Sequence, residues 1–123
     1  MVLTERRPRP ILIVDDDKDI LAAERSVLAE DGFAVREAHN GAEALAALEA
    51  DPPAMIVLDV NMPGIDGPAF ALTLRSRLRR VPLVILTAAP DPKHEADRCN
   101  AEAYLAKPFR ADDLLTLVRR FST

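Results

Sequence analysis

Short, unbroken apolar runs alternate along the chain with segments in which apolar residues recur every three or four positions. Runs of the first kind are typical of strands buried on both faces of a sheet, and segments of the second kind are typical of amphipathic helices. A helical segment follows each apolar run. The runs predict five strands, at residues 11–14, 33–35, 55–59, 81–87 and 103–106.

The helical segments are recognised by their spacing and by the residues at their ends. The first runs to about Glu30, where Gly32 supplies a stop, and Asn40 with Glu43 has the capping-box spacing that opens the second. The last runs from about Arg110 to Phe121. The expected apolar stripes are Ile20, Leu21, Val27 and Leu28 in the first helix, Leu45 and Leu48 in the second, Phe70, Leu74 and Leu78 in the third, and Leu114, Leu117, Val118 and Phe121 in the last.

Strict alternation of strands and helices predicts an α/β fold with a single parallel sheet. The compact arrangement for five such units is a doubly wound sheet in the flavodoxin-like order 2-1-3-4-5. Right-handed crossovers then place helices on both faces of the sheet. In such sheets ligands bind at the carboxyl ends of the strands, where the strand order reverses, so chemistry is expected at that edge.

Length and composition are those of one globular domain. The chain has 123 residues, a net charge of -4, one cysteine and no apolar run of transmembrane length. Residues 1–9, with Arg6, Arg7 and Arg9, are expected to form a flexible arm before a domain at residues 10–122. The acidic balance argues against direct nucleic-acid binding. We expect a cytoplasmic protein without a membrane segment or a disulfide framework.

Polar side chains follow four of the predicted strands. Asp15 and Asp16 end the first strand, Asp59 ends the third, Thr87 ends the fourth, and Lys107 follows the fifth. In the expected order these strands are neighbours, so their side chains should converge. Carboxylates packed together repel one another unless a cation compensates, and Mg²⁺ binds through one or two carboxylates while keeping several waters. Such a set suits phosphoryl transfer onto a carboxylate.

Four segments resemble the receiver domain of two-component response regulators, of the CheY-like superfamily. They are ILIVDDD at 11–17, MIVLDVNMPGIDG at 55–67, VILTAA at 84–89 and YLAKPF at 104–109. The resemblance covers residues 10–122. It implies that Asp59 is the phosphoacceptor and that Asp15, Asp16, Asp59 and the backbone carbonyl of Asn61 hold Mg²⁺, or Mn²⁺ in its place. It also implies that Thr87 and Lys107 contact the phosphoryl group, that Tyr104 is a switch residue, and that the Lys107–Pro108 bond is cis.

The resemblance further implies a function in signalling. A sensor histidine kinase or a histidine phosphotransfer protein would supply the phosphoryl group, and a downstream protein of unknown identity would read the change at the face of the fourth helix, fifth strand and fifth helix. The domain would be no enzyme beyond catalysing its own phosphorylation and dephosphorylation. It would be a monomer or a weak homodimer. The sequence leaves open whether it stands alone or belongs to a longer regulator or hybrid kinase.

Two other functions are compatible with the same fold. A phosphorylation-independent interaction module would be expected to lack an acidic or lysine position, and none is lost. A phosphatase of the haloacid-dehalogenase type would place a second aspartate two residues after the nucleophile, where this chain has Asn61. His94 is expected to lie on a solvated helix, and Cys99 to be a small apolar helix residue.

The chain departs from the family pattern before the fifth strand. Pro90 and Pro92 delay helix initiation, so we expect the fourth helix to be short, shifted or partly disordered. Asn100 stands where the family has a glycine, and asparagine tolerates the left-handed conformation that ends a helix. The altered helix puts dimerisation through this face in doubt.

Overall fold

The computed structural model describes residues 9–78 and 80–122, and the proposed N-terminal arm at residues 1–9 therefore lies outside it except for Arg9. The strands are β1 (Ile11–Val14), β2 (Val35–Ala38), β3 (Met55–Asp59), β4 (Leu83–Thr87) and β5 (Ala103–Ala106). All pairs are parallel, and the order is β2-β1-β3-β4-β5. The predicted doubly wound sheet is confirmed.

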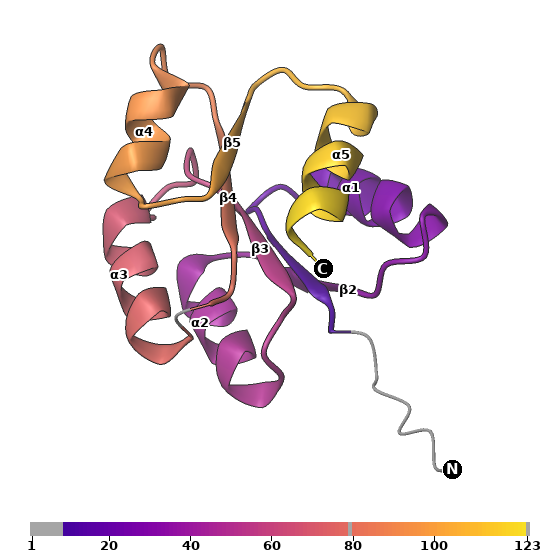
Figure 1. The fold of residues 1–123 in the computed structure, drawn as a ribbon, viewed down its shortest axis with the longest axis horizontal. Helices are drawn as coiled ribbons and strands as arrows, with labels where there is room; N and C mark the ends of the chain where they lie inside the picture. Colours follow the sequence, from indigo (N-terminus) through magenta and orange to yellow (C-terminus); the bar gives the residue numbers. More distant parts are fainter. Residues whose placement is uncertain (1–8, 79, 123) are drawn as a thin grey trace.

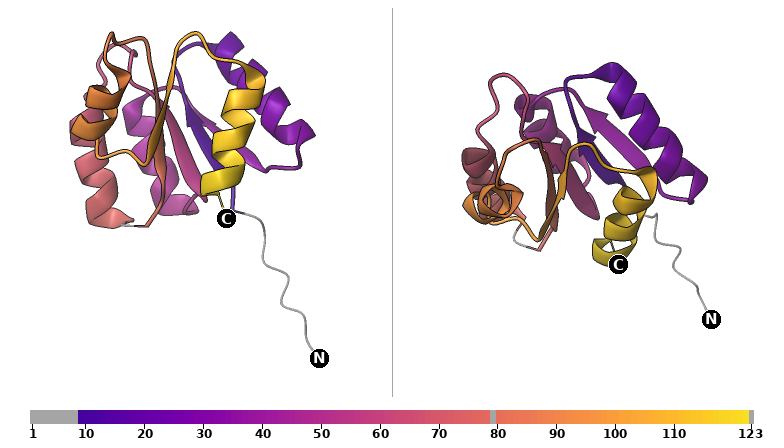
Figure 2. Two further views of the ribbon diagram at one scale, coloured as in Figure 1. Left: turned by 45° about the horizontal axis from the view of Figure 1, so that its top comes forward. Right: turned by 90° about the horizontal axis from the view of Figure 1, so that it is seen from above.

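The helices cover both faces of the sheet. They are α1 (Lys18–Glu30), α2 (Gly41–Ala50), α3 (Gly67–Arg77), α4 (Pro92–Arg98) and α5 (Ala111–Phe121). Figure 1 shows α1 and α5 on one face and α2, α3 and α4 on the other, and Figure 2 shows the same layers from two further sides. None of the described helices is long and apolar enough to cross a membrane.

The core consists of two apolar layers, one on each face of the sheet. Alternate residues of the central strands point to opposite faces, so Leu12 and Ile56 pack beneath α2, α3 and α4, whereas Ile13 and Val57 pack beneath α1 and α5. Every residue of β1, β3 and β4 is buried. The edge strand β5 alternates between half-buried and exposed positions. The central strands are apolar throughout because helices cover both of their faces, as the unbroken apolar runs in the sequence predicted.

Two details of the sequence prediction are wrong. The second strand begins at Val35 rather than Phe33, because Gly32 (φ +90°) ends the turn after α1 and the Phe33 N–H still donates to Leu28 of the helix. The fourth strand begins at Leu83 rather than Val81. The remaining three strands have the predicted bounds.

The buried face of α1 also differs from the prediction. It consists of Leu21, Glu24 and Leu28, whereas Ile20 is exposed. These three residues have the i, i+3, i+7 spacing of one helix face. A charged residue therefore occupies the middle of an apolar stripe.

The short α4 ends in a left-handed residue. Its seven residues confirm the expected shortening, and Asp91 caps it by accepting from the His94 N–H. Asn100 has φ +50°, and the next N–H, of Ala101, donates back to Ala96 at 2.9 Å. Asparagine thus supplies the conformation that glycine supplies in the family pattern.

Replacing Asn100 tests this helix end. We expect Asn100→Ala to lower the free energy of unfolding by about 1 kcal/mol, because the alanine Cβ lies too close to the following carbonyl oxygen in the left-handed region. Asn100→Gly should match or exceed the stability of the wild type. Urea unfolding of the three proteins measures both effects. Equal stability of the alanine and glycine variants would contradict the assignment.

Candidate functional site

The carboxyl edge of the sheet gathers the polar residues that follow the strands. The register pairs Val14 with Leu58, and Asp59 with Leu86, so Asp15 and Asp59 leave neighbouring strands at the same level. Thr87 pairs with Ala106 on the other side of β4, and Lys107 is the next residue. The predicted convergence of these side chains is the consequence of the strand order.

Three carboxylates form the acidic centre of this edge. One oxygen from each of Asp15, Asp16 and Asp59 lies within 4.8 Å of the others. Asp15 and Asp59 are buried, and Asp16 is exposed. Such a cluster of oxygen ligands suits a hard divalent cation that keeps part of its water shell.

Asp15 carries the clearest sign that a cation belongs here. Its Oδ1 accepts from the Asp17 N–H at 2.9 Å, but its buried Oδ2 has no partner among the described residues. Burial raises the pKa of this carboxyl to about 6, opposed by the Asp17 N–H and assisted by the nearby charge of Asp59. A metal ion would supply both the missing partner and the missing positive charge, so the residues fit Mg²⁺.

Lys107 is the positive group of the site. Its Nζ lies 2.8 Å from Oδ1 of Asp59, and the same oxygen accepts from the Asn61 N–H at 2.9 Å. The backbone N–H of Lys107 donates to Thr87 at 2.8 Å, which ties the loop after β5 to the end of β4. The Lys107–Pro108 bond is cis, as expected.

The loops around the cluster are fixed by short-range hydrogen bonds. The fully buried Thr87 hydroxyl accepts from the Ala89 N–H at 3.0 Å. The side-chain oxygen of Asn61 accepts from the Ala88 N–H at 2.8 Å and so joins the loop after β3 to the loop after β4. Two loops that would carry the reacting groups are therefore held to each other.

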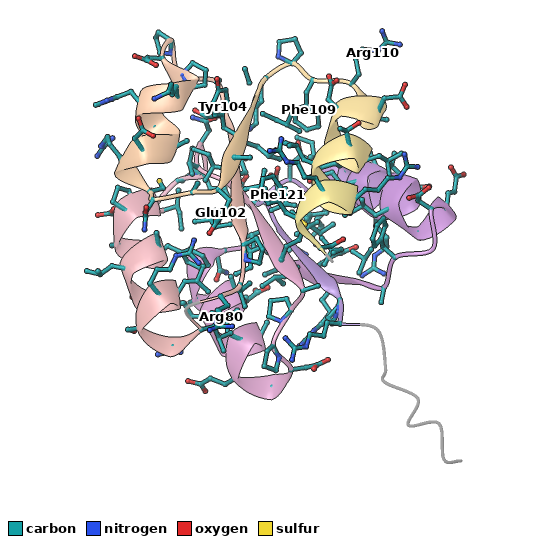
Figure 3. All side chains as sticks on the ribbon, in the orientation of Figure 1. Arg80, Glu102, Tyr104, Phe109, Arg110 and Phe121 are labelled. Atoms are coloured by element: carbon teal, nitrogen blue, oxygen red, sulfur yellow. The ribbon has the colours of Figure 1, made fainter. Side chains whose placement is uncertain are left out.

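The structure also places the other residues of interest on the neighbouring helices and strands. Asp17 caps α1 by accepting from the N–H groups of Asp19 and Ile20. Tyr104 is 39% exposed on β5, where Figure 3 shows its side chain beside α4. Cys99 is buried and burial raises the pKa of its thiol to about 11, in keeping with an inert apolar role. His94 is exposed on α4, as expected.

Residues 11–119 match the response regulator receiver domain family. The chain belongs to this family. Among relatives, response regulator MprA of Mycobacterium avium (strain 104) is 39% identical over 111 residues, which are 89% of this chain and 49% of that protein. Transcriptional regulatory protein PrrA of Mycobacterium tuberculosis (strain ATCC 25618 / H37Rv) shows the same identity over 89% of this chain and 48% of its own length. The chain spans about half the length of these relatives.

Solved structures give the same fold. The chemotaxis protein CheY4 of Vibrio cholerae superposes with a TM-score of 0.83 and 31% identity, over 94% of this chain and 99% of that one. Response regulator TrrA of Thermotoga maritima, solved in complex with Mg²⁺ and BeF, gives a TM-score of 0.82 and 30% identity over 92% of this chain and 98% of its own. The receiver domain is a signalling domain of two-component systems.

Sequence reasoning missed one titratable residue near the site. Glu24 on α1 is only 5% exposed, and its Oε2 has no partner among the residues described. Burial raises the pKa of this carboxyl to about 8, and the charges of Asp15 and Asp59 add to the effect. Its position three residues after Leu21 and four before Leu28 was the available signal, since it places a charge on the apolar face.

Replacing Asp16 tests the metal site. We expect Asp16→Asn to weaken Mg²⁺ binding at least about tenfold, because it removes one of the clustered carboxylates. Asp17→Asn is the matched control, since it removes the same charge one residue later and asparagine caps a helix as well as aspartate. Mg²⁺ titrations followed by amide NMR signals measure both affinities. Equal weakening in the two variants would show a general charge effect instead of a ligand.

Glu24 should make stability depend on pH. The pKa of this carboxyl is 4.5 in the unfolded chain and about 8 in the folded one. Because the folded state therefore binds the proton more tightly, the stability of the wild type relative to Glu24→Gln should fall by a few kcal/mol as pH rises between those two values. Above that window the difference should be constant. Urea unfolding in Mg²⁺-free buffer from pH 5 to 9 measures it.

Glu43→Gln gives a control of opposite sign. The His39 backbone N–H and ring lower the pKa of the Glu43 carboxyl, so the wild type should gain stability relative to this variant as pH rises through the acidic range. A Glu24→Gln difference that stays level between pH 5 and 8 would contradict a buried, protonated Glu24.

Proposed function

We propose that this receiver domain accepts a phosphoryl group from a phosphorylated histidine of a partner protein onto Asp59, with Mg²⁺ bound. The observation that carries the proposal is the buried Asp59 carboxylate, paired at 2.8 Å with Lys107 and grouped with Asp15 and Asp16. A carboxylate can act as a nucleophile toward phosphorus only when the negative charges around it are compensated.

The acidic residues would hold the cation. Asp16 and Asp59 would be direct ligands, Asp15 would stand beside them with its unpartnered oxygen, and the backbone carbonyl of Asn61 would complete the protein ligands. Mg²⁺ bound there would neutralise charge that develops on the transferred group. Mn²⁺, with the same preference for oxygen ligands, would serve in its place.

In the transfer an Asp59 oxygen forms a bond to phosphorus while the bond from phosphorus to the donor histidine nitrogen breaks, and that nitrogen keeps the electron pair. Lys107 is close enough to Asp59 to shift from the carboxylate to a phosphoryl oxygen. The Thr87 hydroxyl accepts one hydrogen bond and keeps its own proton to donate. The domain would thus catalyse its own phosphorylation. Water attacking the same phosphorus would break its bond to the Asp59 oxygen, release inorganic phosphate and restore the carboxylate.

Movement of Thr87 toward the phosphoryl group would alter the surface. It would vacate space at the end of β4, and the half-exposed Tyr104 on the neighbouring strand would turn inward to fill it. The affected surface is the face of α4, β5 and α5. A downstream protein, or a second copy in a weak homodimer, would bind that face differently after phosphorylation.

The alternatives have less support. A module that works without phosphorylation has no use for a buried, lysine-paired carboxylate beside a buried carboxyl oxygen for which the described residues offer no partner. A phosphatase would need a general acid at position 61, but the Asn61 amide cannot release a proton and its oxygen is engaged by Ala88. A sensor kinase or histidine phosphotransfer protein in the cytoplasm remains the proposed phosphoryl donor.

Acetyl phosphate labelling tests the function. The wild type should gain one phosphoryl group in Mg²⁺ and none in EDTA, and Asp59→Asn should gain none. Asp66→Asn is the matched control, because Asp66 is an exposed carboxylate of the same loop that caps α3. Intact-protein mass spectrometry measures the change. Labelling that persists in Asp59→Asn and disappears in Asp66→Asn would reject Asp59 as the acceptor.

Beryllofluoride, which mimics the phosphoryl group, tests the switch with the same proteins. The Tyr104 ring signals in NMR spectra should shift in the wild type, and Thr87→Ala should bind beryllofluoride without that shift. Ring signals that move equally in both proteins would reject Thr87 as the residue that drives Tyr104.

A further inference from the structure

A pocket lies at the opposite edge of the sheet from the acidic cluster. It has a volume of about 340 Å³ and is partly open to solvent. Its lining comes from the chain just before β1, the loop before β3, the end of α3 and the turn before β4. We call it the arginine pocket; its lining residues are Arg9, Pro52, Pro53, Ala54, Arg77, Leu78, Arg80 and Val81. Figure 3 shows Arg80 at the end of the molecule away from Arg110.

The walls of the arginine pocket are fixed by hydrogen bonds. The Ala54 N–H donates to Pro10 at 2.9 Å, which joins two of the lining segments. The Val81 carbonyl accepts from the Arg75 guanidinium at 2.6 Å, and the Leu78 N–H donates to Leu74 at 2.7 Å. These bonds hold the lining backbone at Ala54, Leu78 and Val81 in place.

Its charge is positive in an otherwise acidic domain. In the described part of the chain, neither Arg9 nor Arg80 has a hydrogen bond or an ion pair through its guanidinium. Arg77 pairs with Glu49 at 3.0 Å, but both side chains are well exposed, so this pair contributes little and can be displaced. Three exposed arginine residues therefore line one pocket, and two of them have no acidic partner among the residues that the structure describes.

The floor of the cavity is apolar. Pro53 and Val81 are buried, and Pro52, Ala54 and Leu78 are half-buried. An apolar floor lined by arginine residues suits a ligand with an apolar part and an anionic part. Arginine binds phosphate through paired N–H donors and also stacks on aromatic rings.

We propose that the arginine pocket binds a small phosphate-bearing molecule of the nucleotide class. Its volume is at the lower end of the range of about 300–1,000 Å³ seen for small-molecule sites. One mononucleotide fits that scale, whereas an extended acidic peptide would need a longer groove. The site goes beyond the proposed phosphoryl transfer, because it lies at the amino edge of the sheet and shares no residue with the acidic cluster.

Adenosine monophosphate is the probe for the test. In EDTA, which keeps divalent cations from the acidic cluster, the nucleotide should shift the amide signals of Ala54, Leu78 and Val81 in NMR titrations. Adenosine, inorganic phosphate and tetraglutamate are titrated separately, and each should bind at least about tenfold more weakly than the nucleotide.

The double variant Arg9→Gln with Arg80→Gln should lose at least about tenfold in affinity for the nucleotide. Arg110→Gln is the matched control, because it removes an exposed arginine near the other edge and should leave the affinity within about twofold. Asp59→Asn should also leave it unchanged, which separates this site from phosphoryl transfer. Dispersed NMR spectra of each variant verify that it is folded.

Several results would overturn the proposal. Equal binding of inorganic phosphate and nucleotide would reduce the pocket to a simple anion site. Equal binding of adenosine would show that the arginines play no part, and binding of tetraglutamate alone would indicate a peptide surface. Absence of any shift at 54, 78 and 81, or unchanged affinity in the double variant, would reject the site outright.

Discussion

The ion pair between Lys107 and Asp59 is the interaction on which the functional edge of this domain depends. The carboxylates of Asp15, Asp16 and Asp59 lie within 4.8 Å of one another, and two of them are buried. Like charges so close in a poorly solvated site raise each other's free energy steeply. The Lys107 ammonium group, 2.8 Å from Asp59, offsets part of that repulsion. The negative charge that it leaves uncompensated attracts a divalent cation.

The buried apolar strands stabilise the fold enough to tolerate this acidic edge. Residues of β1, β3 and β4 are buried throughout and pack against helices on both faces, which supplies the stability that the acidic edge removes. Glu24 lowers the stability further, because one of its buried carboxyl oxygens has no partner among the described residues and is destabilising whether the group is neutral or charged. Functional sites commonly retain such unfavourable groups, and the rest of the fold compensates for them.

Much of this could be predicted from the sequence because its signals are local. The bounds of three strands, the cap at Asn40 and the strand-end residues follow from apolar runs and helix-end chemistry. The start of β2 was misplaced because propensity favours Phe33, while the helix end before it decides where pairing begins. Glu24 was missed because a single charge within a helix is read as exposed. The arginine pocket was missed, since its lining comes from residue 9, residues 52–54 and residues 77–81, which only the fold brings together.

Helix polarity explains much of the charge on the two edges, but it leaves part unexplained. In this fold each helix begins at the carboxyl edge of the sheet, so the positive ends of the helix dipoles lie near the acidic residues and the negative ends lie at the amino edge. Arg77, in the last turn of α3, is accounted for by this effect. Arg9 and Arg80 lie outside every helix, and the dipole falls off within a single turn. Both arginines line the same pocket, and their chemistry suits the anionic ligand proposed for it.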